Sequence, residues 1–187
     1  MSLETDQSHD RVKEPPLVSV LVATYQHASY IKECLDGILM QQTDFRFEVL
    51  VGEDESTDGT REICQAYAKA HPDSIKLFLR ERKDVIYING KPTGRSNLKR
   101  LIAEAGGRYI ALCEGDDYWV DPLKLQKQVD ILERDESVSL VFHNVWVRHD
   151  ESRYDHFLNY GLVGDRFSAL EVFSREWFVG TASICVR

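Results

Sequence analysis

The stretch Tyr109–Trp119 reads YIALCEGDDYW and decides both the expected fold and the expected site. Its first five residues are mostly apolar, which indicates a buried strand. Three carboxylates follow this strand at once: Glu114, Asp116 and Asp117. Asp121-Pro122 then predicts the start of a helix, with Asp121 as the N-cap. Because ligands bind beyond the carboxyl ends of the strands in open α/β sheets, we expect the three acids at the rim of a cleft.

Crowding of the three carboxylates predicts a bound cation, because like charges repel one another unless a cation joins them. Hard oxygen ligands of this kind suit Mg²⁺ or Mn²⁺. The alternative is a solvated acidic turn, which would be the better interpretation if the turn stood alone. Here the turn follows a buried strand and ends at the aromatic pair Tyr118-Trp119, so we favour the metal site.

Strand and helix patterns alternate along the chain around this stretch. Near-continuous apolar runs predict parallel strands covered on both faces, at residues 17–24, 47–51 and 75–79. Helical periodicity predicts helices at about 29–40, 61–70, 95–105 and 122–134. Residues 81–94 are expected to form a loop, 138–147 a strand, 168–173 a short helix and 179–186 a last strand; 148–165 gives no clear pattern. The expected fold is therefore α/β, with a doubly wound, mostly parallel sheet flanked by helices.

Length and composition fit one domain at 17–187 behind a disordered polar tail at 1–16. Of the 187 residues, 43% are hydrophobic and 29% are charged, which is ordinary for a globular protein. The net charge of -8 argues against general binding to nucleic acid. No apolar run approaches the roughly 18 residues of a membrane span. No CxxC pair indicates zinc, and the four cysteines lie among apolar residues without a secretory signal, so the expected location is cytoplasmic.

The turns after the first two strands carry further polar candidates. Thr24-Tyr25-Gln26-His27 contains neither a GxGxxG motif nor a P-loop. Tyr25 could stack on a ring and Thr24 could donate a hydrogen bond, with a buried structural tyrosine as the alternative. Glu53-Asp54 ends the second strand, and its carboxylates could accept the N–H of a base such as uracil. Helix capping is the alternative there, and it fits the residues that follow, Ser56, Thr57 and Asp58.

Three motifs together resemble the family 2 glycosyltransferases with the GT-A fold. They are the apolar strand ending in Thr24-Tyr25, the turn Gly52–Thr60, and Glu114–Trp119. The resemblance covers about residues 17–147 and extends more weakly to 187. It implies a Rossmann-like nucleotide-binding layer, a UDP- or dTDP-sugar donor, a divalent cation, Mn²⁺ or Mg²⁺, and transfer with inversion to an acceptor hydroxyl. The expected acceptor is a saccharide or a lipid-linked saccharide, and peripheral association with the inner face of the membrane stays open.

The resemblance also implies roles for individual residues in donor binding. Thr24, Tyr25 and Asp54 match the positions that hold the nucleoside in the family. Glu53 stands where the family usually has the first aspartate of its pair. Glutamate keeps the charge but reaches one methylene further, so its contact is expected to differ or to pass through water.

For the metal, the resemblance implies the acids that opened this subsection. Asp116 matches the metal-binding aspartate of the family's DxD motif, and Glu114 matches its first aspartate, again with Glu in place of Asp. Asp117 follows where the family often repeats the acid. Arg95 and Lys99, around the start of a predicted helix, could add positive charge beside a leaving diphosphate; a solvated helix face is the preferred alternative.

The acceptor side is the part of the site that the sequence defines least. In the family the general base is a carboxylate beyond the last strand, and residues 181–187 offer no matching acid. The base is therefore expected beyond Arg187, in a longer protein, and Asp165 comes too early to match it. His143 could line the acceptor side, with a hydrogen-bonded structural histidine as the preferred alternative. Three aromatic residues could frame a sugar-binding face, with core packing as the default: Trp146, Trp177 and Phe178.

Two other functions remain open from the sequence. A sugar nucleotidyltransferase would need a Gly- and Lys/Arg-rich loop after the first strand, which Thr24-Tyr25-Gln26-His27 does not provide. A non-catalytic nucleotide-sugar-binding domain stays open because no general base is identified.

Overall fold

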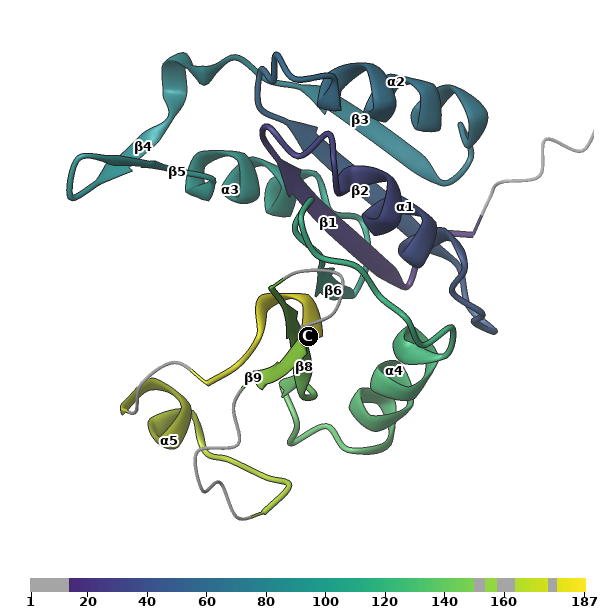
Figure 1. The fold of residues 1–187 in the computed structure, drawn as a ribbon. Coiled ribbons are helices and arrows are strands. Elements are labelled where there is room, and N and C mark those ends of the chain that lie inside the picture. Colours follow the sequence, from purple (N-terminus) through teal and green to yellow (C-terminus); the bar gives the residue numbers. More distant parts are fainter. Residues whose placement is uncertain (1–13, 150–153, 158–163, 175–177) are drawn as a thin grey trace, which may run out of the picture.

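The computed structural model describes residues 14–149, 154–157, 164–174 and 178–187 of the chain. Its main feature is a six-stranded sheet with the strand order β3-β2-β1-β6-β10-β7. Four strands are parallel: β1 (Val18–Thr24), β2 (Phe47–Glu53), β3 (Ile75–Leu79) and β6 (Tyr109–Leu112). Val18 pairs with Phe47 on one side and with Tyr109 on the other, so the carboxyl ends of three strands meet at one edge (Figure 1).

Helices cover both faces of this sheet. Four main helices were predicted to within a few residues, and they are α1 (Ile31–Leu39), α2 (Thr60–Ala70), α3 (Arg95–Glu104) and α4 (Lys124–Arg134). Side chains of α1, α2 and α4 share a core cluster with one face of β1 and β2. Leu101 of α3 packs with Leu21 and Leu50 on the opposite face. The doubly wound α/β fold is therefore confirmed.

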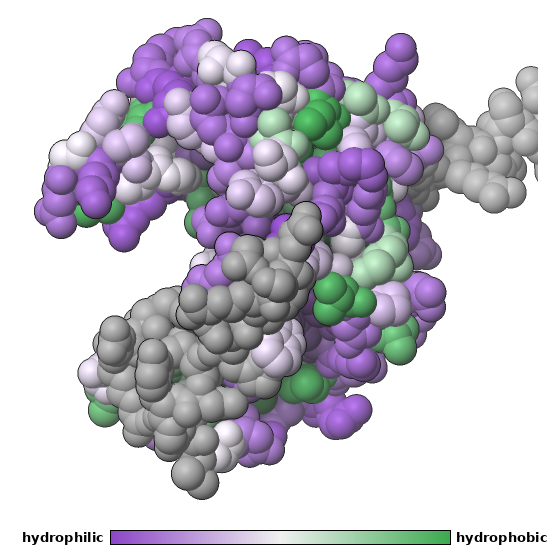
Figure 2. Space-filling model, in the orientation of Figure 1, coloured by the Kyte–Doolittle hydropathy of each residue, from purple (hydrophilic) through white to green (hydrophobic). Residues whose placement is uncertain are grey.

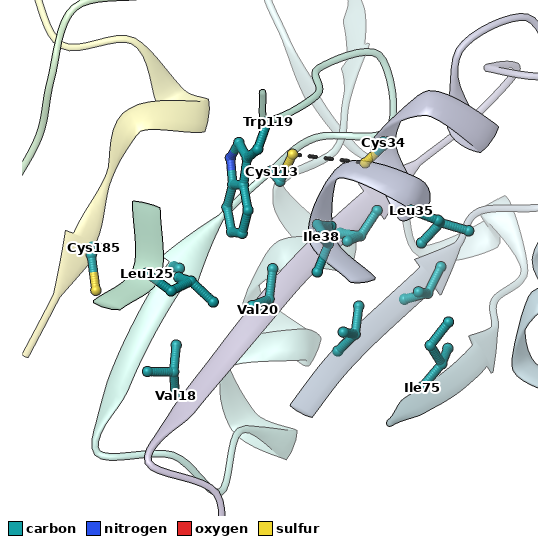
Figure 3. Close-up of a cluster of buried hydrophobic side chains, with 14 of the residues drawn as sticks. Val18, Val20, Cys34, Leu35, Ile38, Ile75, Cys113, Trp119, Leu125 and Cys185 are labelled. Carbon is teal, nitrogen blue, oxygen red and sulfur yellow. Dashed lines mark hydrogen bonds between the residues drawn. The ribbon is translucent and has the colours of Figure 1, made fainter. Parts of the chain in front are cut away.

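The larger core explains why the parallel strands are apolar along their length. Val18 and Val20 of β1 share this cluster with Leu35 and Ile38 of α1 and with Leu125 of α4 (Figure 3). These five side chains are fully buried. Because alternate residues of β1 point to opposite helical layers, both sets are mostly apolar, and the buried exception, Ser19, donates a hydrogen bond to Glu48.

Two predictions for the middle of the chain are wrong. Residues 81–94 form a 3-10 turn, η1 (Arg82–Asp84), and a hairpin of β4 (Ile86–Ile88) and β5 (Lys91–Thr93) instead of a loop. Asn89 and Gly90 join these strands with φ of 50° and 75°, which matches the type I′ turn favoured by Asn-Gly.

The second wrong prediction concerns the start of α4. This helix begins at Lys124 rather than at Pro122, because the Pro122 carbonyl accepts a hydrogen bond from Gln42 N and Asp121 Oδ1 accepts one from Leu123 N. Asp121 therefore closes the turn ahead of the helix.

The C-terminal third also differs from the prediction of two long strands. The expected strand at 138–147 is split into β7 (Leu140–Val141) and β8 (Val145–Arg148). It breaks at Phe142, which leaves the sheet to pack against Phe167 and Phe178. β8 pairs with β9 (Tyr154–Phe157), within the segment that gave no clear pattern.

The expected last strand is reduced to η2 (Thr181–Ser183) and a short antiparallel strand, β10 (Cys185–Val186), between β6 and β7. The short helix α5 (Ala169–Ser174) lies within one residue of its expected place. The predicted tail at 1–16 lies outside the described residues except for its last three. Among the described residues, none of the helices has the length and apolar character of a membrane span.

Gly37 of α1 provides a test of this packing, because α1 lies directly against the chain at Trp119. A Cβ atom at Gly37 would lie 2.6 Å from the Trp119 carbonyl oxygen. We expect Gly37→Ala to lower the free energy of unfolding by about 1–3 kcal/mol in denaturant titrations, whereas alanine at an open helical position would raise it by about 1 kcal/mol. Gly94→Ala is the control: it lies at the N-cap of α3 with nothing within 4 Å of the added atom, and its expected cost is below about 1 kcal/mol. An equal effect of both changes would contradict the close contact.

Candidate active site

The three predicted acids lie together on the loop that follows β6. One carboxylate oxygen from each of Glu114, Asp116 and Asp117 lies within 4.8 Å of the others. The loop is fixed to β1, since Gly115 N donates to the Ala23 carbonyl at 3.0 Å. The sequence prediction that these acids gather at the carboxyl edge of the sheet is therefore confirmed by the geometry.

Gly115 is the residue that lets this loop approach β1. A Cβ atom there would lie 2.6 Å from Thr24 Cβ and 2.7 Å from His27 Nδ1. Thr24 is buried, and its Oγ1 lies 3.3 Å from His27 Nδ1. His27 Nε2 in turn lies 3.8 Å from Asp116 Oδ2. The sequence analysis gave no role to His27, although its place in the turn after β1 was the available signal.

The electrostatics of the acid loop favour a cation. Burial, together with the charge of Asp116, raises the pKa of Glu114. Burial, Asp116 and Glu114 raise the pKa of Asp117 to about 6. These raised pKa values show that the carboxylates repel one another, and a divalent cation bound between them would relieve this repulsion. The donor set, three carboxylates without thiol or imidazole, fits Mg²⁺ or Mn²⁺.

The second group of predicted residues surrounds Tyr25. Tyr25 is 39% exposed, so the alternative of a buried structural tyrosine is wrong. The Arg82 guanidinium lies 3.7 Å from the ring centre and donates to Asp54 Oδ2 at 3.0 Å. Burial raises the pKa of Asp54, and the charge of Arg82 opposes this effect. The sequence analysis missed Arg82, because it lies in the segment 81–94 that was interpreted as a loop.

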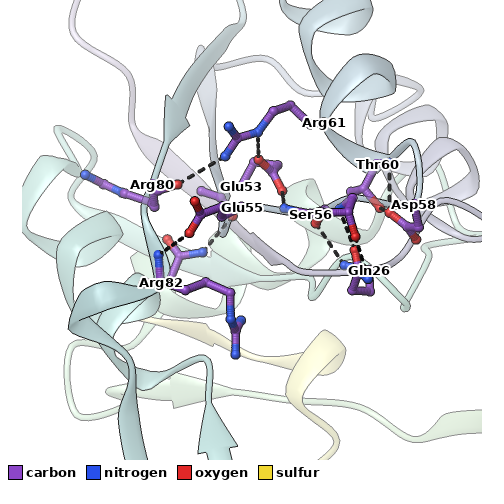
Figure 4. Close-up of polar contacts among 12 residues, drawn as sticks. Gln26, Glu53, Glu55, Ser56, Asp58, Thr60, Arg61, Arg80 and Arg82 are labelled. Carbon is purple, nitrogen blue, oxygen red and sulfur yellow. Dashed lines mark hydrogen bonds and ion pairs between the residues drawn. The ribbon is translucent and has the colours of Figure 1, made fainter.

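The turns after β1 and β2 are locked together by polar contacts (Figure 4). Gln26 N donates to Ser56 Oγ at 2.9 Å, and Thr57 N donates to Gln26 Oε1 at 2.7 Å. Gln26 and Glu55 have φ of 57° and 62°, a region that residues other than glycine seldom adopt. Strain of this kind persists where surrounding contacts enforce it, and it is concentrated at functional sites.

Glu53 is placed differently from what the motif match implied. Its side chain has no exposed surface, accepts a hydrogen bond from Ser56 N at 2.7 Å and forms an ion pair with Arg61 of α2. Alternation along β2 directs Glu53 to the same face as Val49 and Val51, so the period of the strand was a signal for burial. Glu53 thus shapes the turn from inside, and Asp54, which is also largely buried, turns its carboxylate to Arg82 beside Tyr25.

The two basic candidates on α3 lie on its surface. Arg95 and Lys99 are exposed, and within the described part of the chain neither forms an ion pair with the acid loop. The start of α3 nevertheless lies at the correct edge of the sheet, because Asn97 Nδ2 donates to the Gly52 carbonyl at 2.7 Å. The preferred alternative, a solvated helix face, describes what the structure shows.

A groove extends from the acid loop toward the C-terminal elements. Its volume is about 1270 Å³, and its walls include the acids, Trp119, the start of α4 and residues 141–148 and 180–182. His143 and Trp146 line it, and the Trp146 side chain is exposed. Phe178 is buried instead in a cluster of aromatic rings, and Trp177 lies outside the described residues.

The surface over α2 and the β4–β5 hairpin is largely hydrophilic (Figure 2).

The raised pKa of Asp117 predicts a pH dependence of stability in the metal-free protein. The unfolded side chain loses its proton near its usual pKa of 3.8, whereas the folded one retains it to about pH 6. The folded state therefore binds more protons between these values, and stability falls as the pH rises through this window. We expect the free energy of unfolding of Asp117→Asn to rise relative to that of the wild type as the pH is raised from about 4 to about 7. Denaturant unfolding in EDTA measures this difference. Asp130→Asn, on the exposed face of α4, should show no such trend, and parallel curves for all three proteins would contradict the assignment.

The buried pair of Glu53 and Arg61 predicts a large loss of stability when only one partner is removed. Arg61→Met would leave the Glu53 carboxylate buried without its counter-charge. The expected loss in the free energy of unfolding is about 3–5 kcal/mol. Lys32→Met is the matched control, because it breaks an exposed ion pair with Asp36 and should cost no more than about 1 kcal/mol. Similar losses for both variants would show that Glu53 does not depend on Arg61.

Comparison with known proteins gives results consistent with this geometry. The family model described as "Glycosyl transferase family 2" matches residues 19–183. The relative named "Uncharacterized protein Rv1520" of Mycobacterium tuberculosis is 38% identical over 138 residues, which are 74% of this chain and 38% of the relative. The chain therefore spans less than half the length of this relative.

Two solved structures are also similar. The mannosyltransferase PcManGT from Pyrobaculum calidifontis, in complex with GDP-Man and Mn²⁺, is 30% identical with a TM-score of 0.55 over 70% of this chain and 36% of that chain. Residues 1–349 of TarS from S. aureus, in complex with UDP, are 25% identical with a TM-score of 0.50 over 67% of this chain and 34% of that chain.

Proposed function

Because this chain belongs to glycosyl transferase family 2, we propose that it transfers a sugar from a nucleotide-sugar donor to a hydroxyl group of an acceptor. The observation that carries the proposal is the acid loop after β6, which lies against the end of β1, next to Tyr25 and, in the neighbouring turn after β2, Asp54. This arrangement offers one place for a diphosphate and one for a base. The alternatives, a nucleotidyltransferase or a non-catalytic binding domain, have no comparable support from the family match.

Binding of the diphosphate would depend on a divalent cation. Glu114 and Asp116 would hold Mn²⁺ or Mg²⁺ in this proposal, with Asp117 as a third acid close by. A cation bound there acts as a Lewis acid that neutralises the charge of the leaving diphosphate. The Mn²⁺ in the complex of PcManGT supports this choice. Arg95, at the start of α3, would add positive charge from the same edge of the sheet.

Binding of the nucleoside would use Tyr25 and Asp54, with Thr24 in the turn behind them. Asp54 accepts a hydrogen bond from Arg82, and a carboxylate can also accept the N–H of a base. Uracil, thymine and guanine all carry such an N–H beside a carbonyl. PcManGT is in complex with GDP-Man and TarS with UDP, so a UDP- or dTDP-sugar is our first choice and a GDP-sugar the competitor. Glu53 would act indirectly by shaping the turn.

Transfer would proceed with inversion, which requires the acceptor hydroxyl to attack from the side opposite the diphosphate. The groove beyond the acid loop is the available space for an acceptor, for which a saccharide or a lipid-linked saccharide is proposed. A general base must remove the hydroxyl proton. We assign this role to none of the residues described above.

The proposal predicts that nucleotide binding depends on both metal and Asp116. UDP and GDP are tested separately against the wild type, with Mn²⁺ and with EDTA, by thermal and denaturant unfolding. At 100 times its dissociation constant, a bound nucleotide raises the free energy of unfolding by about 2.7 kcal/mol. We expect this increase with Mn²⁺ only, and we expect Asp116→Asn to abolish it while the metal-free variant remains folded.

Asp130→Asn is the control for a lost surface charge and should bind as the wild type does. Equal stabilisation of the wild type in EDTA would refute the role of the metal. Equal stabilisation of Asp116→Asn with Mn²⁺ would refute the assignment of Asp116. The identity of the nucleotide that binds more tightly decides between the two donor classes.

A further inference from the structure

Lys124, the first residue of α4, is a buried cation in the wall of the groove. It is only 4% exposed, and its Nζ donates to Gln128 Oε1 at 2.7 Å. The ammonium also lies 4.0 Å from the ring centre of Trp119. Gln128 is itself fixed, because its amide donates to the Ser183 carbonyl at 2.7 Å. The ammonium is therefore held in one position, next to Trp119, which follows the acid loop in the sequence.

This position is unfavourable for a cation. The first turn of a helix is the positive end of its dipole, which repels a positive charge. Burial lowers the pKa of Lys124 to about 8, and among the described residues no carboxylate forms an ion pair with it. An ammonium has three N–H donors. Gln128 takes one and the indole face attracts another, so at least one lacks an acceptor in the described part of the chain.

The other basic side chains of the groove are already neutralised. Lys127 pairs with Asp121 at 2.7 Å, and Arg148 pairs with Glu33 at 3.0 Å. His143 also lines the groove; burial lowers its pKa, and the charge of Lys124 contributes to the lowering. Among the lysine and arginine residues described in this groove, Lys124 is thus the one without an ion pair.

We propose that Lys124 anchors an anionic group of the acceptor, a phosphate or a carboxylate, in the groove. The inference rests on the proposed function, because it assigns the groove to the acceptor. A charged hydrogen bond from the ammonium would provide the counter-charge that the protein lacks there. The aromatic ring of Trp119 would then lie beneath the bound group.

The charge distribution along the groove would also orient the acceptor. Glu114, Asp116 and Asp117 lie in the same groove as Lys124 and repel an anion from their part of it when no cation is bound; in the proposed complex the donor diphosphate repels it there. An acceptor with one anionic end would therefore bind with that end at Lys124 and with its neutral hydroxyl toward the acids. The volume of about 1270 Å³ exceeds that of most small-ligand sites, so the groove has room for a ligand that spans both parts.

The test uses simple anions without donor, metal or acceptor. Inorganic phosphate, methyl phosphate and glucuronate are titrated at pH 7, in EDTA and at constant ionic strength, into protein with ¹⁵N-labelled lysine. NMR of the Lys124 ammonium, whose signal is assigned by its loss in the Lys124 variants, reports binding directly. Lys124→Met and Lys124→Gln are compared with Lys127→Met by their thermal shifts with each anion.

We expect saturable binding with a dissociation constant on the order of millimolar and a shift of the Lys124 ammonium signal. Both Lys124 variants should bind about tenfold more weakly, whereas Lys127→Met should bind as the wild type does. Tighter binding of the phosphates assigns the group to a phosphate, and tighter binding of glucuronate assigns it to a carboxylate. An unmoved Lys124 signal, or equal weakening by Lys127→Met, would mean an adventitious ion only and would overturn the proposal.

These outcomes are independent of the proposed function, because neither nucleotide nor metal is present. Loss of metal-dependent nucleotide binding would refute the transferase site while leaving the anion titration unchanged. Loss of anion binding at Lys124 would leave the nucleotide experiment unchanged.

Discussion

The close approach of the acid loop to the end of β1 is the constraint on which the candidate site depends. Gly115 donates its N–H to the Ala23 carbonyl, and a side chain at Gly115 would overlap Thr24 and His27. The turn with Tyr25 and the loop with Asp116 can therefore lie next to each other because Gly115, between them, has no side chain. Parallel pairing of β1 with β6 places the carboxyl ends of the two strands side by side. Gly115 then allows the loop after β6 to contact the end of β1.

Buried polar contacts hold the turns after β1 and β2 in place. Glu53 and Arg61 join β2 to α2 in the interior, and the same glutamate holds the backbone N–H of Ser56. Ser56 then receives the N–H of Gln26 from the neighbouring turn. The exposed Tyr25 and the largely buried Asp54 thus rest on a polar framework whose members already bond to one another. Glu53 and Asp54 have different partners, Arg61 and Arg82, because successive residues of an extended chain point to opposite sides.

The parts that could be predicted from the sequence are those that depend on local patterns. Continuous apolar runs located β1, β2 and β6, and the shared edge of parallel strands brought Glu114 and Asp116 together. The predictions that failed depend on distant contacts. Phe142 ends its strand because its partners, Phe167 and Phe178, are more than 20 residues away in the sequence. Burial of Lys124 could not be predicted either, because a charged residue in the first turn of a helix is normally exposed.

Because β10 lies between β6 and β7, this part of the sheet cannot be completed before the end of the chain has been synthesised. Its residues Cys185 and Val186 pair with Ala111 and Ile110 of β6 on one side and with Val141 and Leu140 of β7 on the other. The edge of β6 therefore stays open during synthesis until more than 70 further residues have followed it. Open strand edges pair readily with other chains, and such distant pairing is slow to form. A nascent chain of this topology would expose the hydrogen-bonding edge of β6, beside the segment that carries the acids, until β10 has been synthesised.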